Sequence, residues 1–551
     1  MNMSASIRKL TMLFVVLFVG LSGGLVYWQV AVAQTLTASP HNSRKCAIEN
    51  SPIRGNIYDR NGVLLAESIP TSDPNICGGY TRHYTDPGLA GLIGYYVPGG
   101  NYPATGIEGQ YNAYLNGTNG TTALSNTLNQ TLHTRQVGDN IYLTIDERIQ
   151  KIVEKEYANY TPDPTGLASY LDHGYQTFAT NRGSVVVSDP QTGEILAMYS
   201  SPGYDPNKMV QTLQQGDESY YSQLVQNPDQ PLLFRPTQAL YSPGSTFKTL
   251  TLLAALDTNT TTLNQEWDKN DAYTPWQVPA TATSPGTTIT GDNLGVQQGY
   301  LKHFPVSTAF GFANSDNIMF AHIGNNLGEN TWLNYAKKVY LNQDVPTALS
   351  VQQSSVLQAN GQLNNAQYLN DVYGQGVDNV TPFQMSLIDN TVANNGVLMQ
   401  PLIFTKIADQ NGNPVQTYSP QQLSTVASPT AAFTTRKAMM GVTTCGSAWH
   451  VTEDNRPPTT IIGKTGTAQL GGNQNPHGWM ITQAPFDPNN PNQVPALSIV
   501  GMRENGGEGA YTIGPAIWRM YNDIFSQNLV KTSLPPWTDP NSYCLPNNLW
   551  Q

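Results

Sequence analysis

Along the chain, alternating and periodic apolar residues predict strands and helices separated by turns rich in glycine and asparagine. Residues 54–66 contain two short apolar runs around an Asn-Gly pair, which favours a tight hairpin turn. Residues 141–145 predict a strand, and residues 146–157 predict an amphipathic helix that Asp146 caps. Between these segments, residues 98–137 are rich in glycine, asparagine and threonine, so we expect mostly loop there.

A second unit begins near residue 183 and combines strands at its two ends with helices between them. Residues 183–199 contain two apolar runs around a tight turn, the pattern of an antiparallel hairpin. Helical patterns follow at 246–256, 317–323, 332–339 and 382–394, and strand patterns return at 460–462 and 495–500. This order predicts an α+β fold in which an antiparallel sheet, built from distant parts of the chain, is flanked by helices.

The N-terminus carries a long apolar segment. Arg8 and Lys9 precede residues 10–33, which would form a helix of about 36 Å, enough to cross a hydrocarbon core of about 30 Å. We therefore expect a cytoplasmic N-terminus at residues 1–9, a transmembrane anchor at 10–33 and an extracytoplasmic body. A cleaved signal peptide is the alternative, because Ala31-Val32-Ala33 has the small-x-small pattern of a cleavage site.

Charge and cysteine usage exclude some classes of protein. The net charge of -11, with no basic run, argues against nucleic acid as a partner. All four cysteines lie in the expected exported body, where disulfides form, and three pairings are open to them. Proximity favours Cys46–Cys77 and, with it, Cys445–Cys544. No His/Cys cluster has zinc spacing, so we expect no metal site and no cofactor.

Three short motifs occur in order in the second unit. Ser245-Thr-Phe-Lys248 lies at the start of a predicted helix, Ser315-Asp-Asn317 follows, and Lys464-Thr-Gly-Thr467 lies on or beside a predicted strand. S-x-x-K, S-x-N and K-T-G in this order are the known signature of serine β-lactamases and penicillin-binding proteins.

Each motif supplies a distinct chemical group. Residues i and i+3 share a helix face, so Lys248 can take the proton of the Ser245 hydroxyl, a poor nucleophile until a base activates it. A second cation, Lys464, would lower the pKa of Lys248 and favour its neutral form. Ser315 would relay a proton to the leaving amine, and Asn317 would hold the substrate amide.

The K-T-G segment is expected to bind the substrate. Lys464, Thr465, Gly466 and Thr467 offer a cation and two hydroxyls, which suit a substrate carboxylate. The N–H groups of Ser245 and Thr467 would form an oxyanion hole worth about 3 kcal/mol. Taken singly, these residues have ordinary explanations, such as a helix cap, a solvated lysine or a turn. Their order, on a helix, a loop and a strand outside the membrane, is what favours catalysis.

On these motifs the sequence resembles class B penicillin-binding proteins, which are D,D-transpeptidases. Further segments share the resemblance: 54–62, 106–111, 115–117, 143–146, 204–207, Arg235, 241–248, 374–376 and 381–382. The resemblance implies that Ser245 forms an acyl-enzyme with a D-Ala-D-Ala stem peptide of the cell wall. An amine from a stem peptide on a neighbouring cell-wall strand would then attack this acyl-enzyme and release the serine. It also implies covalent inhibition by β-lactams and a polytopic membrane glycan polymerase as partner. The implied organisation is a mainly β and loop pedestal (dimerisation-like) domain at 34–165, a transpeptidase domain at 166–530 and a tail at 531–551.

Two other functions share these motifs. A β-lactamase would hydrolyse the acyl-enzyme, in one class through a glutamate that activates water. Glu266 and Asn270 have the spacing of that class but precede the S-x-N motif, where that class has them after it. A β-lactam receptor would bind without turnover. Beyond the K-T-G strand, we expect His477 in a surface loop and Trp479 in packing. The sequence leaves open a role in elongation, division or sporulation, and the acceptor amine.

Overall fold

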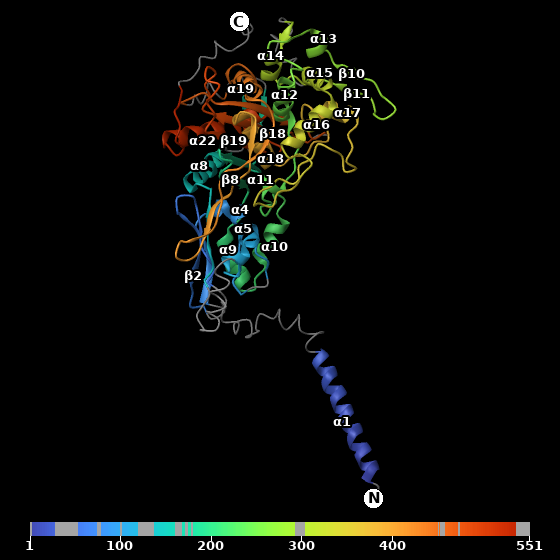
Figure 1. Ribbon diagram of the computed structural model, residues 1–551, viewed down its shortest axis with the longest axis vertical. Coiled ribbons are helices and arrows are strands. Elements are labelled where there is room, and N and C mark those ends of the chain that lie inside the picture. Colours follow the sequence, from blue (N-terminus) through green and yellow to red (C-terminus); the bar gives the residue numbers. More distant parts are fainter. Residues whose placement is uncertain are drawn as a thin grey trace.

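Two large sheets organise the part of the chain that the computed structural model describes. The described residues are 3–27, 53–73, 79–99, 102–119, 137–159, 168–170, 175–177, 180–291, 304–449, 451, 458–471 and 474–535. Figure 1 shows β2 of the first sheet at one end of the body, and β18 and β19 of the second sheet among helices towards the other end.

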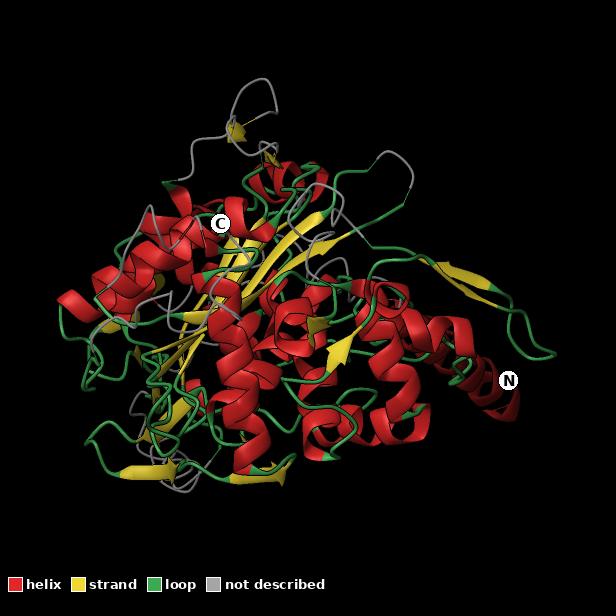
Figure 2. Cartoon of the chain, turned by 90° about the horizontal axis from the view of Figure 1, so that it is seen from above, coloured by secondary structure: helices red, strands yellow, loops and turns green. Residues whose placement is uncertain are grey.

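The second sheet has five antiparallel strands in the order β17-β18-β19-β7-β8. The strands are β7 Gly183–Ser188, β8 Ile195–Ser201, β17 Ile462–Ala468, β18 His477–Ala484 and β19 Leu497–Arg503. The predicted hairpin at 183–199 is β7 and β8, and its neighbour β19 comes from three hundred residues later in the chain. The predicted sheet of distant segments flanked by helices is therefore confirmed (Figure 2).

All four predicted helices of the second unit are present, as α12 Lys248–Asp257, α15 Asn317–Leu327, α16 Glu329–Lys338 and α18 Pro382–Ala393. Helix α18 packs against β7, β18 and β19, and α19 Pro429–Thr444 packs against β17. The predicted helix at 146–157 is α8 Glu147–Ala158, capped by Asp146, and it packs against β8 and α22 Gly514–Ser526. Helices lie on both sides of the strands (Figure 2), and every residue of β7, β18 and β19 is buried.

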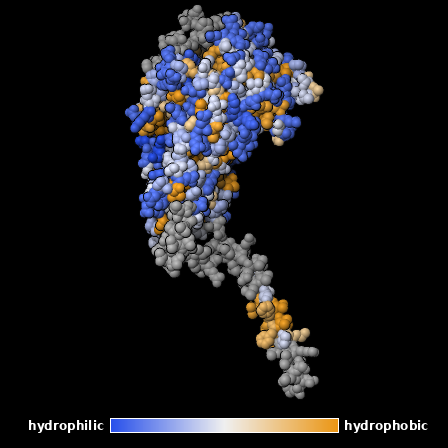
Figure 3. Space-filling model, viewed as in Figure 1, coloured by the Kyte–Doolittle hydropathy of each residue, from blue (hydrophilic) through white to orange (hydrophobic). Residues whose placement is uncertain are grey.

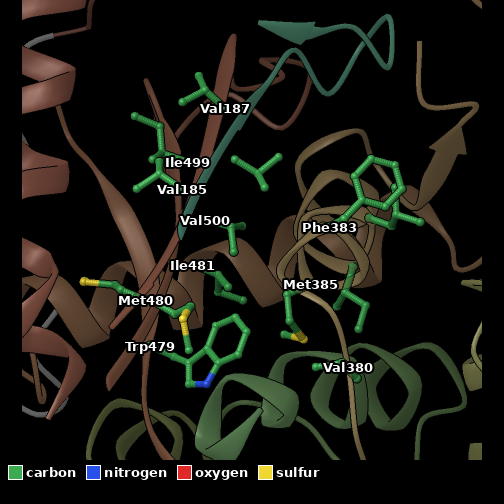
Figure 4. Packing of buried hydrophobic residues seen from close by; sticks show 14 of the residues in the cluster. Val185, Val187, Val380, Phe383, Met385, Trp479, Met480, Ile481, Ile499 and Val500 are labelled. Carbon is green, nitrogen blue, oxygen red and sulfur yellow. The ribbon is translucent and has the colours of Figure 1, made fainter. Parts of the chain in front are cut away.

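The core lies between this sheet and its helices. Figure 4 shows Met385 of α18 near the strand residues Ile481 and Val500, and all three are fully buried. Every residue of β18 is buried, because helices cover both faces of the sheet and neither side of the strand reaches solvent. This packing fixes the position of β17 at the sheet edge.

The first sheet has six strands in the order β15-β14-β4-β1-β2-β3. They are β1 Ile57–Tyr58, β2 Leu64–Pro70, β3 Tyr80–Tyr84, β4 Asn140–Leu143, β14 Phe404–Ala408 and β15 Pro414–Thr417. The predicted hairpin at 54–66 is present as β1 and β2. Two strands come from residues 404–417, so the later part of the chain completes a sheet that begins near the N-terminus. Two short helices, α5 Gly106–Gln110 and α6 Asn112–Leu115, occupy part of the stretch expected to be loop.

A buried carboxylate holds the first sheet to α5. Glu108 is fully buried and pairs with Arg54 Nε at 2.5 Å and Arg82 Nε at 2.6 Å. Burial alone would raise the pKa of Glu108, but the two arginines outweigh it and hold the pKa below its ordinary value. The carboxylate therefore stays charged and paired at neutral pH.

The remaining elements are short or lie at the periphery. The helices are α4 Ala90–Ile93, α9 Pro206–Gln214, α10 Ser219–Gln226, α11 Arg235–Gln238, α13 Lys269–Ala272, α14 Thr308–Ala313, α17 Asn365–Asp371 and α21 Gly509–Thr512. The strands are β5 Ala168–Tyr170, β6 Tyr175–Thr177, β9 Glu266–Trp267, β10 Trp276–Val278, β11 Thr287–Ile289, β12 Val306–Ser307, β13 Val397–Met399 and β16 Gln422–Thr425.

The N-terminal helix α1 spans Met3–Val26 and exposes large apolar side chains, among them Met12, Leu13 and Phe14 (Figure 3). A search of the described residues finds no helix with the length and apolar character needed to span a membrane. The expected anchor at 10–33 continues into residues 28–33, which lie outside the described part of the chain. Cys46, Cys77, Cys544 and most of the predicted tail also lie outside it, so the cysteine pairings remain predictions.

Candidate active site

Ser245 lies in a single 3₁₀ turn, Gly244–Phe247, that leads directly into α12. Gly244 has φ +55°, and a Cβ there would come within 3.0 Å of the Thr467 carbonyl group on β17. A glycine therefore allows both the left-handed backbone and the close approach of the turn to the strand. The serine is placed at the start of a helix, as its sequence position predicts, and next to the K-T-G strand.

Lys248 is the centre of the site. Its Nζ donates hydrogen bonds to Ser245 Oγ at 2.7 Å and to Asn317 Oδ1 at 2.6 Å. The same nitrogen is 3.0 Å from Ser315 O and 3.3 Å from Ser315 Oγ. The Lys248 side chain is fully buried, so these oxygen atoms replace the water that would otherwise solvate it.

Ser315 adopts a backbone conformation that aims two motif residues at Lys248. Its φ is +64°, which is uncommon for a residue with a Cβ and is retained where the surroundings enforce it. The residue lies between α14 and α15, and Asp316 caps α15 by accepting the Met319 N–H at 3.0 Å. This sharp connection directs both the Ser315 hydroxyl and the Asn317 amide into the cluster.

The second lysine approaches Ser315 from β17. Lys464 Nζ donates to Ser315 Oγ at 2.9 Å and to the Thr465 carbonyl at 3.0 Å, and its side chain is fully buried. Burial and the charge of Lys248 lower the pKa of Lys464 well below its usual range. The sequence predicts the same effect at Lys248, and that expectation stays a prediction. Ser315 Oγ bridges the two amino groups.

The K-T-G residues lie on β17, the edge strand of the five-stranded sheet. Gly466 lets β17 approach the serine turn, since a Cβ there would lie 2.9 Å from Thr246 Cγ2 and 3.0 Å from the Pro243 carbonyl. Thr465 is nearly buried, and its hydroxyl is 2.6 Å from Ser447 Oγ. No sequence motif identifies Ser447, which follows α19 and reaches the site through packing of that helix against β17 and a hydrogen bond from its N–H to the Ala313 carbonyl at 3.0 Å.

A buried charge network lies just beyond the K-T-G strand. Glu504 accepts from Arg235 Nε at 2.6 Å and from Tyr241 OH at 2.7 Å. Burial raises the pKa of Glu504, but the Tyr241 hydrogen bond and Arg235 outweigh it, so the net shift is downward. Arg235 and Tyr241 lie in segments that carry the family resemblance, whereas no sequence feature indicates Glu504.

His477 and Trp479 both belong to β18. The expectation of His477 in a surface loop is wrong, because it begins the strand, is 8% exposed and accepts the Asn505 N–H at Nδ1. Burial lowers its pKa to about 4, so the imidazole is neutral at physiological pH. Trp479 is fully buried, which confirms its predicted packing role, and its Nε1 donates to the Ser242 carbonyl at 3.1 Å.

The structure thus joins Ser245, Lys248, Ser315, Asn317 and Lys464 in one hydrogen-bonded cluster. Such a cluster holds a hydroxyl beside a buried amine, with a second hydroxyl able to pass a proton between two amines. In the described part of the chain, no group of His, Cys, Asp and Glu side chains could hold a metal ion.

Comparison with known proteins agrees with this geometry. Residues 183–511 match the family model of the penicillin binding protein transpeptidase domain, and residues 54–141 match the penicillin binding protein A dimerisation domain. The peptidoglycan D,D-transpeptidase PbpA of Mycolicibacterium smegmatis is 29% identical over 534 residues, covering 94% of this chain and 96% of the relative. The Escherichia coli D,D-transpeptidase MrdA is 25% identical, covering 73% of this chain and 60% of the relative.

Solved structures give the same result. The imipenem acyl-enzyme complex of penicillin-binding protein A from M. tuberculosis superposes with a TM-score of 0.71 at 26% identity, covering 86% of this chain and 98% of that one. The penicillin G acyl-enzyme complex of the same protein has a TM-score of 0.69 at 25% identity. The chain therefore belongs to the penicillin-binding protein transpeptidase family.

Proposed function

We propose that this chain is a peptidoglycan D,D-transpeptidase that forms its acyl-enzyme at Ser245, and that β-lactams inhibit it by acylating the same hydroxyl. The observation that carries the proposal is the contact of a fully buried lysine amine, Lys248 Nζ, with Ser245 Oγ at 2.7 Å. The relatives named as D,D-transpeptidases and the neighbours solved as β-lactam acyl-enzymes support it.

The acylation step follows from the cluster. Neutral Lys248 takes the Ser245 proton while Oγ attacks the carbonyl carbon of the first D-Ala in a D-Ala-D-Ala terminus. The C–N bond then breaks, and the departing D-Ala amine receives a proton from Lys248 through Ser315. In the second half an acceptor amine attacks the ester, the peptide bond to the neighbouring strand forms, and Ser245 regains its proton.

Together, Lys464 and Ser315 favour the neutral, unprotonated form of the Lys248 amine. Burial and the charge of Lys248 lower the pKa of Lys464, which favours a pair that carries one proton fewer. Because Ser315 Oγ contacts both nitrogens, it provides a path by which a proton leaves Lys248 and reaches Lys464. Asn317, already bonded to Lys248, is placed to orient the substrate amide next to the nucleophile.

The K-T-G strand supplies the binding edge. Lys464, Thr465, Gly466 and Thr467 lie on β17, the edge strand of the five-stranded sheet, and an extended peptide would bind along this edge beside Ser245. The backbone N–H groups of Ser245 and Thr467 stabilise the oxyanion, and the β17 hydroxyls receive the terminal carboxylate.

A membrane location and a glycan polymerase partner complete the proposal. The apolar side chains exposed on α1, and the Arg8-Lys9 pair at its start, support an N-terminal anchor with the catalytic body outside the cytoplasm. Cell fractionation of the full chain and of a chain lacking residues 1–33 tests the anchor. Recovery of the full chain in the soluble fraction, or a mature protein whose N-terminus shows cleavage after Ala33, would contradict the anchor.

The decisive experiment compares labelling by a fluorescent penicillin in the wild type, Ser245→Ala and the exposed control Ser222→Ala. Wild type and control should be labelled, and Ser245→Ala should not.

Release of D-Ala from a stem-peptide mimic should accompany labelling, while β-lactam hydrolysis should be slow or absent. Rapid hydrolysis would indicate a β-lactamase instead. The glutamate expected of that alternative, Glu266, is exposed on β9. A labelled protein that releases no D-Ala would indicate a receptor.

A further inference from the structure

A loop with no assigned role, residues 371–378, contacts the K-T-G strand. Gln375 Nε2 donates to the Thr467 carbonyl oxygen at 2.9 Å. β17 is an edge strand whose other side is occupied by β18. In an antiparallel strand the N–H and C=O of one residue point to the same side, so the Thr467 N–H faces the open edge together with its carbonyl. Gln375 therefore holds the residue whose N–H is proposed as an oxyanion donor.

The same loop contacts the turn that carries the other donor. Ser242 Oγ donates to the Gly374 carbonyl at 3.0 Å. Gly374 has φ +85°, and a Cβ there would overlap the Gly244 carbonyl oxygen, so the loop backbone lies directly against the turn that precedes Ser245. One loop thus touches both backbone segments that would form the oxyanion hole.

Two buried carboxyl groups close the base of the loop. Asp371 Oδ1 accepts the N–H of Val377 at 2.6 Å and of Asp378 at 3.2 Å, and Asp378 Oδ1 accepts the Gly376 N–H at 3.0 Å. Both carboxyl groups are fully buried or nearly so. Burial raises the pKa of both, that of Asp378 to about 7, and the charge of Asp378 adds to the rise at Asp371, which favours one proton held between them.

We infer that residues 371–378 form a buttress that positions the oxyanion hole, with Gln375 as the positioning residue and the Asp371–Asp378 pair as the support of the loop. The inference rests on the proposed function of Ser245 and Thr467. Oxyanion donors act over a narrow range of distance, and a misplacement of about 1 Å can cost about 100-fold in rate. Loss of the buttress should therefore slow acylation while leaving the initial non-covalent binding of a β-lactam unchanged.

The first test is Gln375→Ala, with Gln353→Ala as control because Gln353 is exposed and bonds only Asp344 among the described contacts. Rapid mixing with a fluorescent penicillin gives the acylation rate constant and the non-covalent dissociation constant separately. We expect the rate constant to fall about tenfold and the dissociation constant to stay within about twofold. An unchanged rate, or a loss confined to binding, overturns the inference. Failure of the wild type to react at Ser245 would instead overturn the proposed function.

The second test separates the shared proton from the carboxylate charge. Asp378→Asn keeps an acceptor for the Gly376 N–H and supplies an N–H in place of the shared proton, so acylation should stay within about twofold of the wild type. Asp378→Ala removes both the acceptor for the Gly376 N–H and the shared proton, so its acylation rate constant should fall about as much as that of Gln375→Ala. Equal rates for the two Asp378 variants would contradict the support role of the pair. Should Asp378→Ala fail to fold, the Gln375 variant still decides the inference.

Discussion

Replacement of Lys248 by arginine separates its role as a base from its role as a cation. Lys248 and Lys464 both contact Ser315 Oγ, at 3.3 and 2.9 Å. The two nitrogens are thus at most about 6 Å apart, and two like charges at that separation repel by about 3 kcal/mol at an effective dielectric constant of about 20. Together with burial, repulsion of this size lowers the pKa of an amine in the pair and favours release of its proton. Arginine retains positive charge but does not lose its proton in proteins.

Lys248→Arg should therefore keep the charge at the site and lose the base. We expect the second-order rate constant for acylation by a fluorescent penicillin to fall by about 10² to 10⁴, equivalent to about 3 to 5 kcal/mol in the barrier. Lys248→Ala should lose a similar amount, and circular dichroism should show that both variants remain folded. A Lys248→Arg enzyme that acylates at the wild-type rate would refute the base assignment.

Three other changes have defined outcomes. Glu108→Gln should lower the free energy of unfolding at pH 7 by about 3 kcal/mol, because it leaves two buried arginines without a counter-ion. The pKa of Glu108 is lowered in the folded state, so this stabilisation is present above the unfolded pKa of about 4.3 and disappears as the pH falls through the folded value. Urea unfolding at a series of pH values measures this dependence. Arg235→Met should destabilise by about 2 to 3 kcal/mol, because it removes the 2.6 Å ion pair and leaves Glu504 only the longer contact with Arg182 at 3.4 Å and the Tyr241 hydrogen bond, and a melting temperature equal to that of the wild type would contradict the pairing. Ser447→Ala should weaken β-lactam binding about fivefold through its contact with Thr465 and leave the acylation rate constant unchanged, as the same rapid-mixing assay can show.

Much of the second unit could be predicted because its local patterns agree with its final structure. The hairpin at 183–199 and the helix at 382–394 have strong periodicity and clear ends, so packing did not override them. The sequence also predicts that the motif residues share one site, because their spacing and order match the known S-x-x-K, S-x-N and K-T-G signature. Ser245 and Lys248 are also neighbours on one turn, which local geometry alone requires.

Other features depend on contacts that no local pattern encodes. Strands β14 and β15 join a sheet whose other strands end at residue 143, a pairing between segments far apart in the chain. Ser447, Gln375 and Glu504 reach the site through tertiary packing, and each is an ordinary polar residue in its own neighbourhood. The sequence predicts His477 in a surface loop, yet the residue begins β18, a strand that is buried throughout.

The central claim is that one serine hydroxyl, activated by a buried lysine, is the nucleophile. Intact-protein and peptide mass spectrometry after exposure to benzylpenicillin tests it directly. A single penicilloyl group on the peptide that contains Ser245, absent from Ser245→Ala and strongly slowed in Lys248→Arg, is the result expected from the geometry. Modification of another residue, or an unmodified Ser245 after saturation with the drug, would contradict it.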